Sequence, residues 1–353
     1  MRITKVAGHA CIRVHKMGIP LMDRGHDVRL IAKKEVPFVE WYKTFTYTFG
    51  VNNYIDAIEM HSGVTDVFHV HNEPSWFVTA IKEQCNVPVV LDVHDSFLAR
   101  TTPEEEDAQR KEGLDTFRVS VEERNNFQLA DALVFPSQKF ANIILNEFKI
   151  DKPYIVLPSY VPRQFYQYHG KSWLGGLVYE GRCDIQSDID KTARMRGFQY
   201  AVYEDFAKHA NDLGMDFHIY ATRTDQPFMD IYDDIAFVHA ALPFEEMLAH
   251  VARHDWGLLG NIMKTAEWDV AMPNKLFEYI AAGVPIVAIN ARDCGEFVEE
   301  HGIGIRVESL KELTNRWGEH KICREKLLKI RQQFTMERHI DKLEGLYHKV
   351  AKC

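Results

Sequence analysis

The chain has 353 residues, of which 46% are hydrophobic and 12% aromatic. This is enough apolar material for sizeable cores, and two α/β domains are a better expectation for this length than one. The formal net charge of −9 argues against general nucleic-acid binding, which needs a basic surface.

The cysteines and the N-terminus indicate where the protein works. The six cysteines include no Cys-x-x-Cys pair, which favours reduced thiols over a disulfide framework or a zinc site. The first residues enter a strand-like run without the apolar core of a signal peptide. No run of about 18 apolar residues is present, so no transmembrane helix is expected. We therefore expect a cytoplasmic protein.

Strands and helices alternate from the beginning of the chain. Ile3–Ala7 and His26–Ala32 are predicted strands, and an amphipathic helix from about Cys11 to Asp23 joins them. A strand–helix–strand unit is typical of a doubly wound parallel sheet. The intervening turn contains Gly8 and His9 but no G-x-G-x-x-G pattern, which argues against a dinucleotide oxidoreductase.

A basic and aromatic segment follows. The first 50 residues hold nine lysines and arginines against four acidic residues, and residues 37–49 are rich in aromatic side chains. Such a patch suits contact with an anionic membrane surface or an acceptor pocket. A partly buried loop is the alternative, and the one that we favour.

Two further buried strands, at 67–74 and 87–95, carry polar side chains toward their C-terminal ends: His69, His71, His94 and Asp95. In parallel sheets, ligands bind in the crevice at that edge. A metal site is an alternative, but the spacing does not define a tetrahedral ligand set. Strand-end residues held by neighbouring loops remain the structural interpretation.

The alternation of predicted strands and helices continues on both sides of a two-proline linker at 158–162. Predicted strands are 132–137, 154–157, 176–182, 216–221, 235–239, 256–260 and 286–289. Predicted helices are 75–84, 119–129, 138–148, 197–213 and 243–253, with further helices from 310 to 349. A polar loop is expected at 183–196, and the domain boundary near residue 165.

The stretch 271–289 carries signals for both the start and the end of a helix. Pro273 suits the first helical position, Gly283 supplies a left-handed stop, and a buried strand follows. The helix start presents the N–H groups of Asn274, Lys275 and Leu276 together with the positive charge of Lys275, which suits a phosphate or diphosphate.

Glu278 lies on the same face of this helix as Asn274, where its carboxylate can accept hydrogen bonds from sugar hydroxyls. An ordinary surface helix with a Lys275–Glu278 ion pair is the alternative.

The segment Pro-Asn-Lys-Leu-Phe-Glu-Tyr-Ile-Ala-Ala-Gly-Val-Pro-Ile-Val at 273–287 resembles the donor-site segment of retaining nucleotide-sugar glycosyltransferases of the GT-B fold, especially family 4. The resemblance implies an α/β fold of two Rossmann-like parallel-sheet domains facing each other across a cleft. It divides the chain into an acceptor-side domain (1–165), a donor domain (166–335) and a C-terminal helix (336–353) that crosses back to the first domain.

The resemblance also implies roles for individual residues. The helix start would bind the donor diphosphate and Glu278 the nucleotide ribose, while the turn from His239 to Leu242 would hold the base. Arg182 and, more loosely, Arg196 would clamp the phosphates as the glycosidic bond breaks. The donor is then a UDP- or GDP-sugar, with no metal or other cofactor.

On the acceptor side, His94 matches the family's histidine that faces the acceptor and the transferred sugar, where a neutral imidazole could accept a hydrogen bond or move a proton. Gly8, His9, His71 and Asp95 would line the same side. The acceptor would be a carbohydrate or glycolipid, and nucleic acid is not an expected partner. In the family's common motif, another Glu stands eight residues before Glu278, where this chain has Val270.

Two other functions remain open. A sugar-nucleotide epimerase of the same fold would need acids and bases between the domains, which His94 and Asp95 could in part supply. A nucleotide-sugar-binding protein without activity is conceivable because of Val270.

Overall fold

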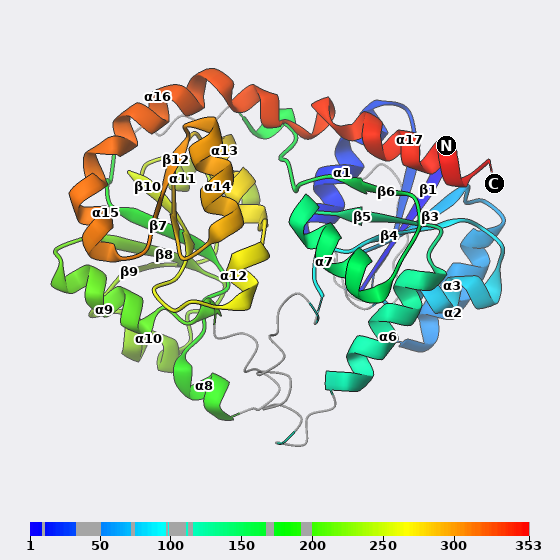
Figure 1. Cartoon of the computed structure of the whole chain (residues 1–353), viewed down its shortest axis with the longest axis horizontal. Coiled ribbons are helices and arrows are strands. Elements are labelled where there is room, and N and C mark those ends of the chain that lie inside the picture. Colours follow the sequence, from blue (N-terminus) through cyan, green and yellow to red (C-terminus); the bar gives the residue numbers. More distant parts are fainter. Residues whose placement is uncertain are drawn as a thin grey trace. The chain divides into compact units, whose positions relative to one another are not determined.

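The computed structural model describes residues 1–8, 11–32, 51–71, 75–96, 98, 111, 116–166, 173–191 and 200–352. The chain divides into two compact units (Figure 1). The first unit contains residues 1–110, 115–162 and 335–353, and the second contains residues 111–114 and 163–334. The basic aromatic segment at 37–49 lies outside the described residues.

The first unit is built on a six-stranded sheet of order β2-β1-β3-β4-β5-β6, in which every pair is parallel. Its strands are β1 (Arg2–Ala7), β2 (Asp27–Ala32), β3 (Val67–His71), β4 (Val89–Asp92), β5 (Ala132–Phe135) and β6 (Tyr154–Val156). Their Val-, Ile- and Leu-rich runs are mostly buried, as expected for parallel strands covered on both faces.

The helices of the first unit form two groups (Figure 1). Its helices are α1 (Ile12–Asp23), α2 (Val51–Ser62), α3 (Phe77–Gln84), α6 (Thr116–Leu129), α7 (Gln138–Phe148) and α17 (Ile340–Val350), with a 3₁₀ turn η6 (Met336–Arg338). Helix α3 packs on both α2 and α6, and α1 packs against α17. Helix α7 belongs to neither group and packs against β5. The Tyr347 hydroxyl of α17 lies 2.6 Å from Nδ1 of His69, which joins the C-terminal helix to β3.

The second unit has a six-stranded parallel sheet of order β12-β11-β10-β7-β8-β9. Its strands are β7 (Leu177–Gly181), β8 (Phe217–Ala221), β9 (Phe237–His239), β10 (Trp256–Gly260), β11 (Ile286–Ile289) and β12 (Gly304–Val307). Numbered from its own first strand, this is the 3-2-1-4-5-6 order of the Rossmann fold.

The helices of the second unit differ from expectation mainly at its start. Its helices are α8 (Gln186–Lys191), α9 (Glu204–Asp212), α10 (Gln226–Tyr232), α11 (Phe244–Val251), α12 (Ala266–Val270), α13 (Asn274–Ala282), α14 (Arg292–His301), α15 (Leu310–Arg316) and α16 (His320–Ile330), with 3₁₀ turns η2 (Arg163–Phe165), η4 (Trp317–Glu319) and η5 (Arg331–Phe334). Helix α8 occupies part of the predicted polar loop.

Helix α9 begins at Glu204, seven residues after the predicted start at 197. The residue before it, Tyr203, is fixed by two hydrogen bonds. Its hydroxyl donates to the carbonyl of Gly260 at 3.0 Å, and its N–H donates to the Tyr232 hydroxyl at 2.9 Å. No helix of the described residues is both long and apolar enough to cross a membrane.

Close strand packing leaves no room for a side chain at the end of β10. Gly260 has a φ of 89°, and a Cβ there would lie 1.8 Å from the carbonyl oxygen of Ile289 in β11. Glycine is therefore required both by the backbone conformation and by the neighbouring strand.

Gly260→Ala is expected to lower the free energy of unfolding by more than about 4 kcal/mol, because the β11 backbone would have to move. Gly214→Ala is the matched control, since Gly214 has a φ of 69° but no atom within 4 Å of its Cβ position. Gly214→Ala should lower the free energy of unfolding only through the positive φ of the backbone, by about 1–2 kcal/mol. Denaturant unfolding followed by circular dichroism compares them, and equal losses would contradict the steric explanation.

Candidate active site

The strand orders place one topological switch point in each unit. In the first sheet the order reverses between β1 and β3, and in the second between β7 and β10. Open parallel sheets bind ligands in the crevice at the carboxyl ends of such strands. In each unit some of the predicted site residues lie at or just after these strands, such as Gly8 after β1 and Arg182 after β7.

At the switch point of the first unit, the strand register brings predicted residues together. Ala7 of β1 pairs with His71 of β3, and His71 pairs with Asp92 of β4. Gly8 directly follows β1, and His94 follows β4. His9 lies outside the described residues. Four of the five acceptor-side predictions, Gly8, His71, His94 and Asp95, can therefore be located at one edge.

The centre of this edge is a carboxylate that sequence reasoning did not single out. Asp92 is fully buried and accepts hydrogen bonds from Arg13 Nε at 2.7 Å and Nη2 at 2.8 Å. His71 Nδ1 lies 3.0 Å from Asp92 Oδ2, and His94 Nδ1 lies 3.5 Å from it. Burial opposes the charged form of Asp92, but Arg13 and the two histidines outweigh it and hold the pKa of Asp92 well below its usual range.

The neighbouring histidine and lysine are less charged than their residue types suggest. Burial lowers the pKa of His71 to about 3, with further lowering by Lys5. Burial also lowers the pKa of Lys5 to about 7, although the charge of Asp92 opposes this. Since a carboxylate only accepts, neutral His71 carries its proton on Nδ1, and its Nε2 accepts from Lys5 Nζ at 3.2 Å.

His69, His71 and Asp92 form the one group of three metal-type ligands found among the described residues, with their ligand atoms within 4.8 Å of one another. Most of the polar atoms of this group already have protein partners, although His69 Nε2 has no hydrogen-bond partner among the described residues. Asp92 is paired with the Arg13 guanidinium, Lys5 faces His71 Nε2, and His69 Nδ1 contacts the Tyr347 hydroxyl. Two basic side chains in contact with the ligand set do not suit a divalent cation.

In the second unit, α13 has the termini that the sequence predicts, with one shift. Pro273 is the N-cap residue and not the first helical residue, and Gly283 at φ 75° ends the helix. The N–H of Leu276 donates to the Pro273 carbonyl at 3.2 Å, so it is already engaged, unlike the prediction that it faces a phosphate. Asn274 and Lys275 remain the predicted anion-facing residues of this turn.

Lys275 reaches from α13 to the end of β7. Its Nζ donates to the Tyr179 hydroxyl at 3.3 Å and lies 4.6 Å from the centre of that ring. A Cβ on Gly181, the last residue of β7, would be 3.7 Å from Nζ. The ammonium group therefore stands at the switch point of the second sheet, and the absence of a side chain at Gly181 leaves space beside it.

Arg182 follows Gly181 and is tied to the same tyrosine. The Tyr179 hydroxyl donates to the Arg182 carbonyl at 2.7 Å, and Arg182 Nε donates to Asp184 at 2.6 Å. The side chain of Arg182 is still 40% exposed. Arg196, the second predicted phosphate ligand, lies outside the described residues.

The acidic residues near α13 differ in their surroundings. Glu278 is 4% exposed, so its carboxylate is a buried group of α13 and not part of a solvated surface. Val270 ends α12, and the adjacent Asp269 is bound by Arg292 at 3.2 Å. Glu267, in the first turn of α12, is the other acidic residue within three positions of Val270.

His239 and Leu242 flank the turn predicted to hold a nucleotide base. The His239 ring stacks on Tyr220 with centroids 4.4 Å apart, and its Nε2 lies 3.0 Å from Nδ1 of His218. Burial lowers the pKa of His239, assisted by the charges of His250 and Arg253. The imidazole is thus engaged within the sheet, which leaves backbone groups as the available contacts of this turn.

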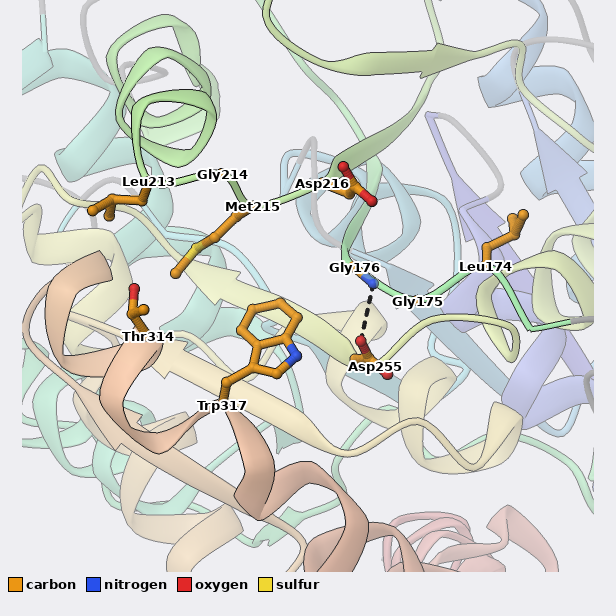
Figure 2. Close-up of a pocket in the computed structure, with 10 residues that line it drawn as sticks. All are labelled: Leu174, Gly175, Gly176, Leu213, Gly214, Met215, Asp216, Asp255, Thr314 and Trp317. Carbon is orange, nitrogen blue, oxygen red and sulfur yellow. Dashed lines mark hydrogen bonds between the residues drawn. The ribbon is translucent and has the colours of Figure 1, made fainter.

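A cavity of about 390 Å³ lies elsewhere in the second unit (Figure 2). Its lining includes Gly176 before β7, Asp216 before β8 and Asp255 before β10, with the Trp317 ring on one side. These positions belong to the amino ends of the strands. Because Lys275 and Arg182 stand at the carboxyl ends, this cavity is separate from the predicted donor residues.

Sequence reasoning missed the groups that hold the predicted ones in place: Arg13, Asp92 and Tyr179. Arg13 and Asp92 lie 79 positions apart, and Tyr179 and Lys275 lie 96 apart. Asp92 stood within the predicted strand at 87–95, and its charge in an otherwise apolar run was the available signal. Tyr179 gave no signal beyond an aromatic residue in a buried strand.

A family model, glucosyltransferase 3-like C-terminal domain, matches residues 203–335. The chain is similar in structure to a sucrose-phosphate synthase from Thermosynechococcus elongatus, at 13% identity over 99% of this chain and 98% of that chain, with a TM-score of 0.69. It is also similar to HepE from Anabaena in complex with UDP, at 12% identity, 99% and 100% coverage and a TM-score of 0.66.

A third similar structure is an α-glucosyltransferase in complex with UDP and a 13-mer DNA containing an HMU base, at 14% identity, 98% and 99% coverage and a TM-score of 0.60. No curated protein matches the chain. Two six-stranded parallel sheets and these whole-chain likenesses confirm the predicted α/β fold of the GT-B class. The family model and the DNA-bound structure are glucosyltransferases by name, which agrees with the predicted class of enzyme.

Arg13→Met is expected to lower the free energy of unfolding by about 3–5 kcal/mol, because it leaves the buried Asp92 carboxylate without its main counter-charge. The double variant Arg13→Met/Asp92→Leu should lose less free energy of unfolding than Arg13→Met, since it removes both charges. Arg2→Met is the control, because the Arg2–Asp66 pair is exposed and should leave the unfolding midpoint unchanged. Urea unfolding measures all three, and a double variant no more stable than Arg13→Met would contradict the charge argument.

Proposed function

We propose that the protein is a glycosyltransferase that moves a sugar from a UDP-sugar to a hydroxyl group of a carbohydrate or glycolipid acceptor, with retention of the anomeric configuration and without a metal. The observation that carries the proposal is the ammonium group of Lys275 beside Gly181, at the carboxyl edge of the sheet where β7 and β10 are neighbours. Several of the similar structures are complexes with UDP, which favours uridine over guanosine.

The chemistry follows from cations at the start of α13. A departing nucleoside diphosphate gains negative charge as the glycosidic bond breaks, and preorganised positive groups stabilise that charge. Lys275 uses one N–H toward Tyr179 and has two further donors. Arg182 is half-exposed at the end of β7, and we propose that it is the second phosphate ligand, with Arg196 as a third.

Retention is proposed through departure and attack on the same face of the sugar. In this scheme the acceptor hydroxyl attacks the anomeric carbon as the bond to the diphosphate breaks. The leaving phosphate oxygen takes the acceptor proton, so no carboxylate base is required. This is consistent with a valine at position 270, where the related motif has glutamate.

Incubation with a panel of UDP- and GDP-sugars tests the proposal. Release of UDP, accelerated by an added acceptor, is the expected result, and NMR of the anomeric proton of the product should show the configuration of the donor. Val270 also favours a second candidate, a nucleotide-sugar-binding protein without activity, for which binding without turnover is the expected outcome. An altered sugar still linked to its nucleotide would instead indicate an epimerase.

Lys275→Ala is expected to raise the Kd for UDP by roughly 10–100-fold, the effect of losing a charge-assisted hydrogen bond to phosphate. Because the lost group faces phosphate, the Kd for inorganic diphosphate should rise in the same way. Glu278→Gln should weaken the binding of UDP but not of inorganic diphosphate, since Glu278 is proposed to bind the ribose.

Lys321→Ala, which removes an exposed lysine of α16, is the control and should leave both constants unchanged. Isothermal titration calorimetry measures the constants. Unchanged UDP affinity in Lys275→Ala and Glu278→Gln would show that the donor site lies elsewhere.

A further inference from the structure

The surroundings of His94 set its protonation state. The ring Nδ1 is inaccessible to solvent and faces Asp92 Oδ2 at 3.5 Å, while the side chain as a whole keeps 17% exposure. The exposed part of the ring therefore does not include Nδ1. On the other side, Nε2 lies 4.0 Å from Asp95 Oδ2. The titratable groups that face His94 are Asp92, Asp95 and Cys11, and His71 contacts the same Asp92 carboxylate.

Asp92 cannot rotate away from His94, because three other contacts fix it. Arg13 binds both carboxylate oxygens, and Arg13 Nη2 also donates to the Leu157 carbonyl at 2.9 Å. His71 donates to the same oxygen that faces His94. The carboxylate is thus fully buried, charged and held in one orientation.

A fixed anion beside a ring nitrogen favours the doubly protonated imidazole. Burial alone would lower the pKa of His94, but the contacts with Asp92 and Cys11 outweigh it and raise the pKa well above its ordinary value. The contrast with His71 is instructive. Both histidines touch Asp92, but His71 also faces Lys5, whose charge opposes a second cation.

We infer that Asp92 is a positioning residue for His94: it orients the ring through Nδ1 and keeps it an imidazolium, so that the opposite edge donates a hydrogen bond to an oxygen of the ligand. This charged ring differs from the neutral imidazole expected from the sequence. A ring protonated on both nitrogens has no lone pair, so it can donate a hydrogen bond but cannot accept a proton. The role of that hydrogen bond in sugar transfer rests on the proposed function, whereas the protonation of His94 does not.

Nitrogen-detected NMR of the full chain labelled with ¹⁵N-histidine tests the first part without any assay of activity, with the His94 signals assigned from their loss in His94→Asn. The wild-type His94 ring should remain protonated on both nitrogens at pH values well above the ordinary histidine midpoint of about 6.5. Asp92→Asn, which keeps the shape and removes the charge, should shift the midpoint to about 6.5 or below. A wild-type midpoint at or below that value overturns the inference, even where Asp92→Asn does not fold.

His71→Asn is the matched control. The asparagine amide can still donate where His71 Nδ1 donates, and the charge of Asp92 remains. The midpoint of His94 should therefore stay close to its wild-type value in this variant. If His71→Asn lowered the midpoint as much as Asp92→Asn, the effect would come from general loosening of the cluster, and the role of Asp92 would be refuted.

The pH profile of transfer tests the second part. A raised pKa means that the donating form is present at low pH and is lost as pH rises, so Asp92→Asn should lose at least tenfold in kcat at pH 7.5 and recover part of it at pH 5.5. A loss independent of pH would indicate a structural role only. Absence of turnover in the wild type would contradict the proposed function while leaving the NMR result intact.

Discussion

The first unit depends on the neutralisation of one buried carboxylate. Asp92 is the last residue of β4 and is fully buried. An uncompensated charge there would lower the stability of the fold by several kcal/mol. Arg13 meets it with two hydrogen bonds and gives a third to Leu157 after β6. A single guanidinium therefore joins α1 to β4 and to the residue that follows β6. The same interaction orients the carboxylate toward His71 and His94, so the support of the edge and its electrostatics have one origin.

In the second unit, the charged group at the switch point is held by a neutral side chain. Tyr179 is buried in β7, and its hydroxyl accepts from Lys275 and donates to the Arg182 carbonyl. A lysine held by a phenol and an aromatic face keeps its charge available to a ligand, whereas a carboxylate partner would cancel it. The two units thus place a fixed anion in one and an available cation in the other, each at a switch point of its own sheet.

Much of this arrangement follows from local rules. Pro273 and Gly283 bound α13 because proline lacks a donor and glycine accepts a positive φ, and neither fact depends on the rest of the chain. The polar residues toward the carboxyl ends of β3 and β4 were expected to lie together because parallel strands share a carboxyl edge. Helix α9 escaped prediction at its start, since Tyr203 is held by Gly260 and Tyr232, which are far from it in sequence.

The sequence by itself determined the alternation of strands and helices, the helix start that carries Lys275, and the strand ends that carry His71 and His94. These follow from periodicity and from end signals within a few residues. Only the tertiary structure decided that Asp92 is paired with Arg13, that Lys275 rests on Tyr179, and that His71 and His94 differ in charge beside one carboxylate. Those outcomes depend on Coulomb interactions and burial between groups brought together from distant positions, and no local pattern encodes such distances.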